Sequence, residues 1–253
     1  MSAGFASVPG VLGRALDVVF PPRCAGCANG PWPFCEECVR ELVALAPPWC
    51  DRCGRPAPRQ VPRCVDCPPD PVSNARAPFL YAGPARRAIH RLKFSGWRHV
   101  ADALAHAMVA VGPPRVDAVS WVPLARRRLA ERGYDQAQAL ARAVASRLEL
   151  PLIHCARRVV ATEPQARRSG EERRAAMAGA FTPRGSAPDR VLLVDDVLTT
   201  GATASACARA VVEAGAREVS LLTAARAFAR SEGRGYTRTG SRPGLWLPGD
   251  LPR

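Results

Sequence analysis

The run from Val191 to Thr203 contains the residues of this sequence whose types and spacing are best suited to binding a ligand. Four apolar residues of β-strand type precede Asp195 and Asp196, and a small-residue turn then enters an apolar helix pattern. Adjacent carboxylates at the end of a strand accept hydrogen bonds from ribose hydroxyls or hold hydrated Mg²⁺ against phosphates. The turn offers hydroxyls and backbone N–H groups at the positive end of a helix dipole, which favours a phosphate. Its residues are Thr199, Thr200, Gly201, Ala202 and Thr203, so the pattern predicts a ribose-phosphate site.

This run resembles the signature of type I phosphoribosyltransferases, which bind 5-phosphoribosyl-1-pyrophosphate (PRPP). The resemblance rests on the apolar strand, both aspartates, Thr-Thr-Gly and the following Thr203. It implies that Asp195 and Asp196 hold the ribose and that Mg²⁺ accompanies PRPP. Purine-salvage members that carry a carboxylate at the position of Thr199 use it near the base, and a threonine cannot accept that proton. The departure argues against hypoxanthine or guanine salvage.

Eight of the ten cysteines form four C-x-x-C pairs. Each pair places two thiolates on one tight turn, and two such turns complete a tetrahedral Zn²⁺ site. The spacing predicts two structural zinc ribbons; sequential pairing is the simpler scheme, and a crossed scheme stays open. A disulfide framework is the alternative, but we find no secretory signal pattern, and repeated C-x-x-C spacing is typical of zinc sites. The predicted ligands are Cys24, Cys27, Cys35, Cys38, Cys50, Cys53, Cys64 and Cys67; Cys155 and Cys207 are predicted to be core thiols.

Alternating strand and helix patterns after residue 78 predict an α/β domain with a parallel sheet. A helix with Ala85 and Leu92 on its apolar face ends near Lys93, the single lysine of the chain. A compact ammonium there suits a phosphate, and a solvated helix residue is the alternative interpretation. A further strand is expected at 152–155, after a helix at 136–148 that Asp135 would cap.

Three consecutive arginines follow a predicted strand at 117–122. Ligands of parallel sheets bind at the carboxyl ends of the strands, so the loop 123–128 and the aspartate pair are expected to share one crevice. In phosphoribosyltransferases the corresponding loop embraces the pyrophosphate, so the resemblance implies that Arg126, Arg127 and Arg128 face phosphates. A basic, solvated turn is the alternative for each arginine.

The chain has 253 residues, a formal net charge of +14 and a pI near 10.3. This charge favours polyanionic partners such as nucleic acid or nucleotide phosphates, although a GC-rich coding sequence would also supply many arginines. No apolar stretch reaches the length that spans a bilayer, so we expect a cytoplasmic protein without membrane insertion. The predicted organisation is a packing helix within 1–22, a double zinc ribbon at 23–68, a phosphoribosyltransferase-like domain at 78–228 and a disordered tail at 229–253.

Several motifs in a fixed order resemble the ComF competence-protein family. They are Phe-Pro-Pro before the first cysteine pair, the eight cysteines, Leu-Lys-Phe-x-Gly, Val122-Pro-Leu, Arg132-Gly-Tyr-Asp-Gln-Ala137, Thr162-x-x-Gln165 and the PRPP run. The resemblance covers residues 11 to about 226. It implies a double zinc ribbon joined to a phosphoribosyltransferase-like domain that acts with a helicase in the uptake of transforming single-stranded DNA, or in its use as a nutrient.

Three functions remain open at this point. A DNA-uptake factor would bind PRPP or nucleotide phosphates and single-stranded DNA with little turnover. A metabolic phosphoribosyltransferase would release pyrophosphate with one base acceptor, and a zinc-ribbon interaction protein would not need Asp195 or Asp196. No base-binding hood is recognisable in the sequence, and the zinc module is a candidate for that place. The sequence leaves open turnover, the acceptor and the oligomeric state.

Overall fold

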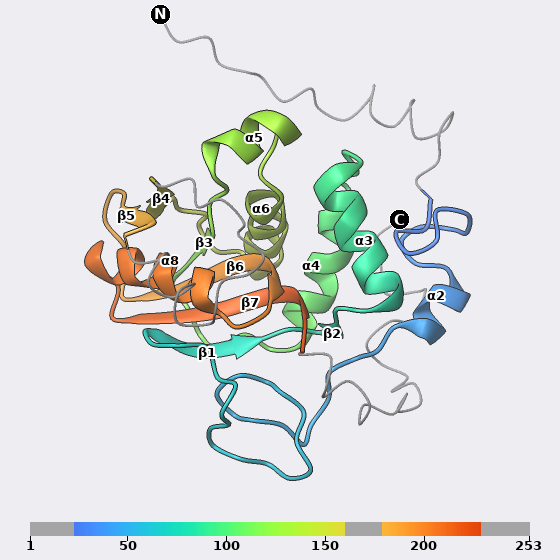
Figure 1. Cartoon of the computed structure of the whole chain (residues 1–253), viewed down its shortest axis with the longest axis horizontal. Coiled ribbons are helices and arrows are strands. Elements are labelled where there is room, and N and C mark those ends of the chain that lie inside the picture. The colour runs from blue at the N-terminus through green and yellow to red at the C-terminus, as the bar shows by residue number, and fades with distance from the viewer. Residues whose placement is uncertain (1–22, 160–178, 229–253) are drawn as a thin grey trace, which may run out of the picture.

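A computed structural model describes residues 23–159 and 179–228 of the chain (Figure 1). Its centre is a parallel sheet with the strand order β1-β7-β6-β3, in which β2 also pairs with β7. A separate antiparallel pair joins β4 to β5. The strands are β1 (Val72–Arg76), β2 (Phe79–Leu80), β3 (Ala118–Trp121), β4 (Ala156–Arg158), β5 (Phe181–Pro183), β6 (Arg190–Leu198) and β7 (Glu218–Arg226). The α/β architecture with a parallel sheet is therefore as predicted.

Helices cover both faces of this sheet and divide the interior into two apolar layers. The helices are α2 (Glu36–Glu41), α3 (Gly83–Phe94), α4 (Val100–Ala110), α5 (Arg126–Arg132), α6 (Gln136–Leu148) and α8 (Ala202–Glu213). Helices α3, α4 and α6 pack on the face that carries Leu192 and Val194, whereas α8 packs on the face that carries Val191 and Leu193. Side chains alternate between the two faces of a strand, so both faces of β6 must be apolar.

Strand β6 is longer than the sequence pattern suggested. Asp195 pairs with Thr223 of β7, and the pairing continues to Leu198 opposite Arg226. The two aspartates therefore belong to the strand, on opposite faces, and only the last residues before α8 form the turn. Pairing with β7 fixes the backbone of both aspartates and therefore the direction in which each side chain leaves the strand.

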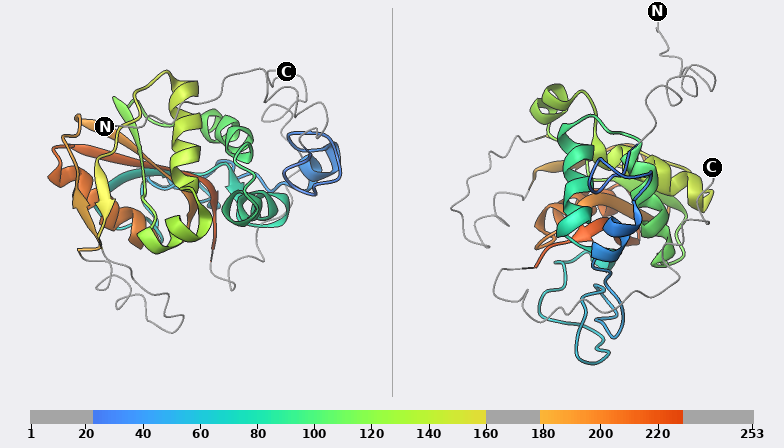
Figure 2. Two further views of the ribbon diagram at one scale, coloured as in Figure 1. Left: turned by 90° about the horizontal axis from the view of Figure 1, so that it is seen from above. Right: turned by 90° about the vertical axis from the view of Figure 1, so that its right-hand side faces the viewer.

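The two zinc ribbons lie at different places on the α/β domain. The first ribbon, residues 23–41, packs beside α3, and the second ribbon, residues 49–68, lies next to β1 (Figures 1 and 2). Strand β1 lies between the predicted end of the double zinc ribbon at residue 68 and the predicted start of the next domain at residue 78, and its Val72 and Ala75 are buried against β7. The chain thus passes directly from the second ribbon into the sheet.

Two local expectations differ from the structure. Arg126, Arg127 and Arg128 form the first turn of α5 rather than a loop. The segment expected as a strand at 152–155 makes a single parallel bridge, between Leu152 and Val119, before the chain turns into β4. The predicted helix within 1–22, the whole Thr162-x-x-Gln165 motif and the tail at 229–253 lie outside the described residues. Within the described ranges, no helix is both long and apolar enough to cross a membrane.

Candidate functional site

Asp196 is the most constrained polar side chain at the carboxyl end of β6. Its Oδ1 lies 2.7 Å from Lys93 Nζ, and its Oδ2 accepts a hydrogen bond of 2.8 Å from Gln136 Nε2. The Asp196 side chain is only 7% exposed, and Gln136 is also buried. Both carboxylate oxygens are thus satisfied from two helices, α3 and α6, that are well separated along the chain. The structure brings Lys93 and the aspartate pair together.

Gln136 also connects this carboxylate to the last residue of α5. Its Oε1 accepts a 2.9 Å hydrogen bond from Arg132. The preceding residue, Asp135, caps α6 by accepting from the amides of Ala137 and Gln138, and its other oxygen accepts from the amide of Leu124. Burial raises the pKa of Asp135, although these three amides oppose the shift. The cap therefore fixes the segment after β3 to the start of α6.

Asp195 lies on the opposite face of β6 and is partly buried. Its Oδ1 accepts a 2.8 Å hydrogen bond from the amide of Asp196. Burial and the neighbouring Asp196 raise the pKa of Asp195 well above its usual value, against the effect of that amide and of Lys93. Burial lowers the pKa of Arg158 on β4, and the negative charge of Asp195 partly offsets this effect. Cations therefore surround a pair of carboxylates that is unfavourable when fully ionised.

Replacing Asp195 with asparagine is expected to stabilise the free chain at pH 7. Because the pKa of Asp195 is raised in the folded state, its stabilising contribution is complete below the ordinary carboxyl pKa of about 4 and is lost as the pH rises. The neutral amide avoids this loss, and we expect a gain of about 1 kcal/mol, or about 2–4 °C in Tm. Thermal unfolding between acidic and neutral pH measures the effect.

The gain should shrink as the pH falls toward the ordinary carboxyl range. Asp102→Asn, a substitution at an exposed position on α4, is the matched control and should give no such pH-dependent gain. A Tm difference for Asp195→Asn that is independent of pH would contradict the assigned cause.

The predicted phosphate cradle lies at the junction of β6 and α8. Thr199 and Thr200 are exposed, and Gly201 begins α8 in the left-handed region with φ +77°. The amide of Ala202 lies 3.4 Å from Thr200 Oγ1. The exposed hydroxyls and the first amides of an α-helix with twelve residues form a suitable anion cradle, with Thr203 also in the first turn.

The three predicted arginines lie in the first turn of α5. All are exposed, and Arg127 donates to Glu131 one turn later. Three cations in the first turn oppose the helix dipole, so an anion bound there would relieve repulsion. Arg128 is close enough to Arg158 for its positive charge to lower the pKa of Arg158. Arg128 is therefore the one of the three that the electrostatics link to the surroundings of Asp195.

The eight predicted metal ligands form two separate groups of four. In each group the sulfur atoms all lie within 4.8 Å of one another. Zinc–sulfur bonds of about 2.3 Å in a tetrahedron require sulfur atoms about 3.8 Å apart. The Sγ atoms of Cys27 and Cys35 are 3.7 Å apart, and those of Cys50 and Cys67 are 3.6 Å apart. The groups bind structural Zn²⁺, with first-to-second and third-to-fourth pairing of the C-x-x-C motifs.

Backbone amides support the thiolates of these sites. The amide of Cys35 donates to Cys24 Sγ at 3.3 Å, and the amide of Asn29 donates to Cys27 Sγ at 3.4 Å. The amides of Asn29 and Gly30 lower the pKa of Cys27 to about 6. Such amides orient ligands and favour the metal-binding thiolate. The remaining two cysteines, Cys155 and Cys207, are buried in the α8 layer, as predicted for core thiols.

The second ribbon is attached to the carboxyl end of the sheet beside the cradle. Arg226, at the end of β7 and only 1% exposed, donates to the carbonyls of Cys53 at 2.5 Å and Asp66 at 2.9 Å. Ser205 of α8 donates to the carbonyl of Asp70 at 2.6 Å. A Cβ atom on Gly201 would lie 2.7 Å from Cβ of Pro68, so only glycine permits this approach. The ribbon and the cradle therefore share one packed boundary.

Gln136 and Arg226 contact the candidate site or its boundary and were not selected as site residues from the sequence. Gln136 is a polar residue at a buried position of an otherwise alanine-rich helix, and Arg226 is a single cation that ends an apolar strand. A polar side chain in an apolar pattern is costly to bury without a partner. A polar residue at a position where the pattern predicts an apolar one was therefore the sequence signal that could have identified Gln136 and Arg226.

Comparison with known proteins places the fold and zinc ribbons in a family. The double zinc ribbon domain matches residues 15–68. The DNA utilization protein YhgH of Escherichia coli O157:H7 is 32% identical over 212 residues, covering 77% of this chain and 90% of that protein. The chain belongs to the ComF competence-protein family. Two further ComF relatives are competence protein F of Haemophilus influenzae and competence protein ComFC of Bacillus subtilis. Each is 28% identical to this chain; the first match covers 77% of this chain and 90% of the relative, the second 76% and 83%.

Membership of the ComF family confirms the resemblance drawn from the order of the motifs. The aligned region is much longer than the zinc ribbons, so the relationship extends into the α/β domain that carries Asp195 and Asp196. The family names of the relatives refer to competence and DNA utilization.

Proposed function

We propose that this ComF-family chain binds PRPP or a related nucleotide phosphate at Asp195, Asp196 and the α8 cradle. We further propose that it acts in the cytoplasm in the uptake or use of transforming single-stranded DNA. The observation that best supports this proposal is the arrangement at the end of β6, where the carboxylates of Asp195 and Asp196 lie next to the exposed cradle and Lys93. The names of the relatives support the biological part. A competence helicase is the proposed partner, as the resemblance of the motifs implies.

The two aspartates differ in what they can offer a ligand. Asp196 already uses one oxygen for Lys93 and the other for Gln136. Asp195 uses Oδ1 for the amide of Asp196, and within the described ranges no hydrogen bond occupies its Oδ2. Asp195 is therefore the carboxylate that would accept from a ribose hydroxyl, and Asp196 would hold Lys93 and Gln136 in position. Bound Mg²⁺ would neutralise phosphate charge, and the same carboxylates are the hard oxygen ligands that it prefers.

Each of the remaining groups has a distinct task in this proposal. The first amides of α8 and the hydroxyls of Thr199, Thr200 and Thr203 would bind the 5-phosphate. Lys93 and Arg128 would place positive charge near the pyrophosphate, where charge develops if the glycosidic bond breaks. No protein nucleophile is needed for that reaction. Turnover would still require a base acceptor.

Calorimetric titration with PRPP, with and without Mg²⁺, tests the proposal. The parent should bind saturably, and the Asp195→Ala, Asp196→Ala double variant should lose at least about tenfold in affinity, because each charge-assisted contact contributes about 1.5–3 kcal/mol. The double variant must retain two zinc ions and a cooperative unfolding transition, which separates loss of binding from loss of the fold.

The same titration distinguishes the alternative functions. Pyrophosphate release with one added nucleobase would identify a metabolic phosphoribosyltransferase. Absence of PRPP binding by the parent would sink the phosphoribosyl site and leave a zinc-ribbon interaction protein.

A further inference from the structure

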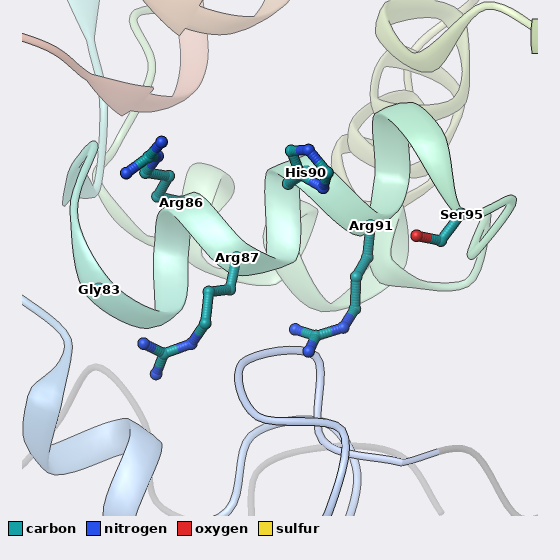
Figure 3. Close-up of a pocket in the computed structure, with 6 residues that line it drawn as sticks. All are labelled: Gly83, Arg86, Arg87, His90, Arg91 and Ser95. Carbon is teal, nitrogen blue, oxygen red and sulfur yellow. The ribbon is translucent and has the colours of Figure 1, made fainter.

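One face of α3 carries cations that the phosphate site does not use. A groove with a volume of about 470 Å³ runs along this helix between Gly83 and Ser95. Its lining residues, within the described part of the chain, include Arg86, Arg87, His90 and Arg91. In Figure 3, Arg87 and Arg91 extend toward the first ribbon, whereas Arg86 and His90 extend away from it. The groove is therefore rich in positive charge along its whole length.

Two of the three arginines that line the groove are bound to the first zinc ribbon, and one is available. Arg87 donates to the carbonyl of Gly26 and pairs with Glu41, and Arg91 donates to the carbonyls of Ala25 and Gly26. Arg86 is exposed, and no hydrogen bond or ion pair holds its guanidinium within residues 23–159 and 179–228. Arg86 can therefore bind an anion without breaking a structural contact.

Aromatic rings lie next to these cations. Phe94, at the end of α3, is 60% exposed, and its ring lies 4.6 Å from that of His90. The Arg132 guanidinium lies 4.7 Å from the Phe94 ring. Phe94 therefore presents an exposed flat ring beside an arginine, a combination suited to a ligand that has both flat faces and negative charge.

We propose that the outer face of α3, from Arg86 to Phe94, binds single-stranded nucleic acid. Arg86 would contact the phosphate backbone, and the ring of Phe94, adjoined by His90, would stack on a base. Single strands expose the base faces that stack on aromatic side chains, whereas a duplex conceals them. An acidic protein segment would match the charge but would not require an exposed ring. This inference rests on the proposed role in handling single-stranded DNA and assigns that role to a surface.

The surface adjoins the candidate phosphate site through the same helix. Lys93 precedes Phe94 and contacts Asp196, so the two sites occupy neighbouring positions at the end of α3. A strand bound along α3 would therefore pass the opening of the phosphoribosyl site. Arg132 contacts both Gln136 of the phosphate site and the Phe94 ring, whereas Arg86 has no hydrogen bond or ion pair to the phosphate site within the described residues.

Fluorescence anisotropy with a labelled oligothymidine, measured over a range of salt concentrations, tests this surface. Arg86→Ala should lower the slope of log affinity against log salt by about 0.7, the value for one phosphate contact on a single strand. Phe94→Ala should weaken binding by about fivefold or more, and Phe94→Trp should retain it, because any aromatic ring supports stacking. Arg142→Ala removes the same charge from an exposed position on α6 and should leave binding close to that of the parent.

Several outcomes would overturn the assignment. They are parent-like binding by both Arg86→Ala and Phe94→Ala, equal binding of the matching duplex, equal binding of polyglutamate, or no oligothymidine binding by the parent. PRPP titration of Arg86→Ala separates this inference from the proposed function, because this variant should keep PRPP affinity. Loss of PRPP binding only in the aspartate variants, with DNA binding intact, would leave both assignments standing.

Discussion

Cys53→Ser is expected to remove both the second zinc ion and the proposed phosphate binding. Structural zinc contributes about 10–16 kcal/mol in small zinc-binding peptides, so a ribbon with one ligand missing loses its fold. Cys53 also presents the carbonyl that buried Arg226 binds, and Pro68 of the same ribbon contacts Gly201. Loss of the ribbon would thus expose the boundary of the cradle. We expect PRPP affinity to fall by at least about tenfold, which corresponds to about 1.4 kcal/mol.

Cys27→Ser in the first group of four cysteines is the matched control. That group packs against α3 through Arg87 and Arg91, and within the described residues no hydrogen bond or ion pair joins it to the cradle. Its loss should release one zinc ion and lower Tm while PRPP affinity stays within about threefold of the parent, a change of less than about 1 kcal/mol. Zinc content, calorimetry and amide hydrogen exchange of residues 199–203 give three readouts. Equal PRPP affinity in Cys53→Ser and the parent, with unchanged exchange of the cradle, would exclude the coupling.

Among the described glycines of the α/β domain, Gly201 is expected to be the one whose replacement by alanine is most destabilising. The residue has a positive φ, and the new Cβ would meet Pro68 at 2.7 Å. The left-handed conformation costs about 1–2 kcal/mol for an L-residue, and forced overpacking adds about 1–3 kcal/mol. Because Pro68 and Gly201 belong to different modules, the strain would push the second ribbon away from α8. Both stability and PRPP binding should therefore decline.

Gly112→Ala separates the two contributions to this effect. Gly112 has a φ of +70°, close to that of Gly201, but its added Cβ would meet nothing within 4 Å. Urea unfolding of the two variants should show the backbone cost in both and the additional cost only in Gly201→Ala. Equal losses of unfolding free energy would mean that the ribbon yields without resistance, and the close approach of Pro68 would then have no energetic role.

The sequence allowed the site to be predicted wherever a local pattern carried the information. The apolar run before Asp195 and the helical pattern after Gly201 placed the aspartates and the cradle at one end of a strand. The C-x-x-C spacing likewise identified the zinc ligands, because each turn forms within a few residues. These elements depend on neighbours in the chain.

The features that the sequence did not predict depend on distant residues. Gln136 meets Asp196 across 60 positions, and Arg226 meets Cys53 across 173. No periodicity relates such pairs, so only the folded arrangement brings them together. The prediction of a loop at Arg126–Arg128 was wrong for a local reason. These residues begin the short helix α5, which ends at Gly133 with φ +71°. Strand β1 was missed because its few apolar residues lie between prolines.

The position of β7 between β1 and β6 has a consequence for the order of assembly during synthesis. Both cysteine groups leave the ribosome well before β7, so zinc can load while most of the sheet is still missing. The second ribbon can dock on the sheet only after β7 has been synthesised. Strand β1 pairs with β7, and Arg226 at the end of β7 donates to the carbonyls of Cys53 and Asp66. Pairing between distant segments is slow and leaves strand edges exposed. A nascent chain that stalls before Arg226 would hold its metal but remain a target for chaperones and proteases, so completion of β7 is the step that commits the chain to its native state.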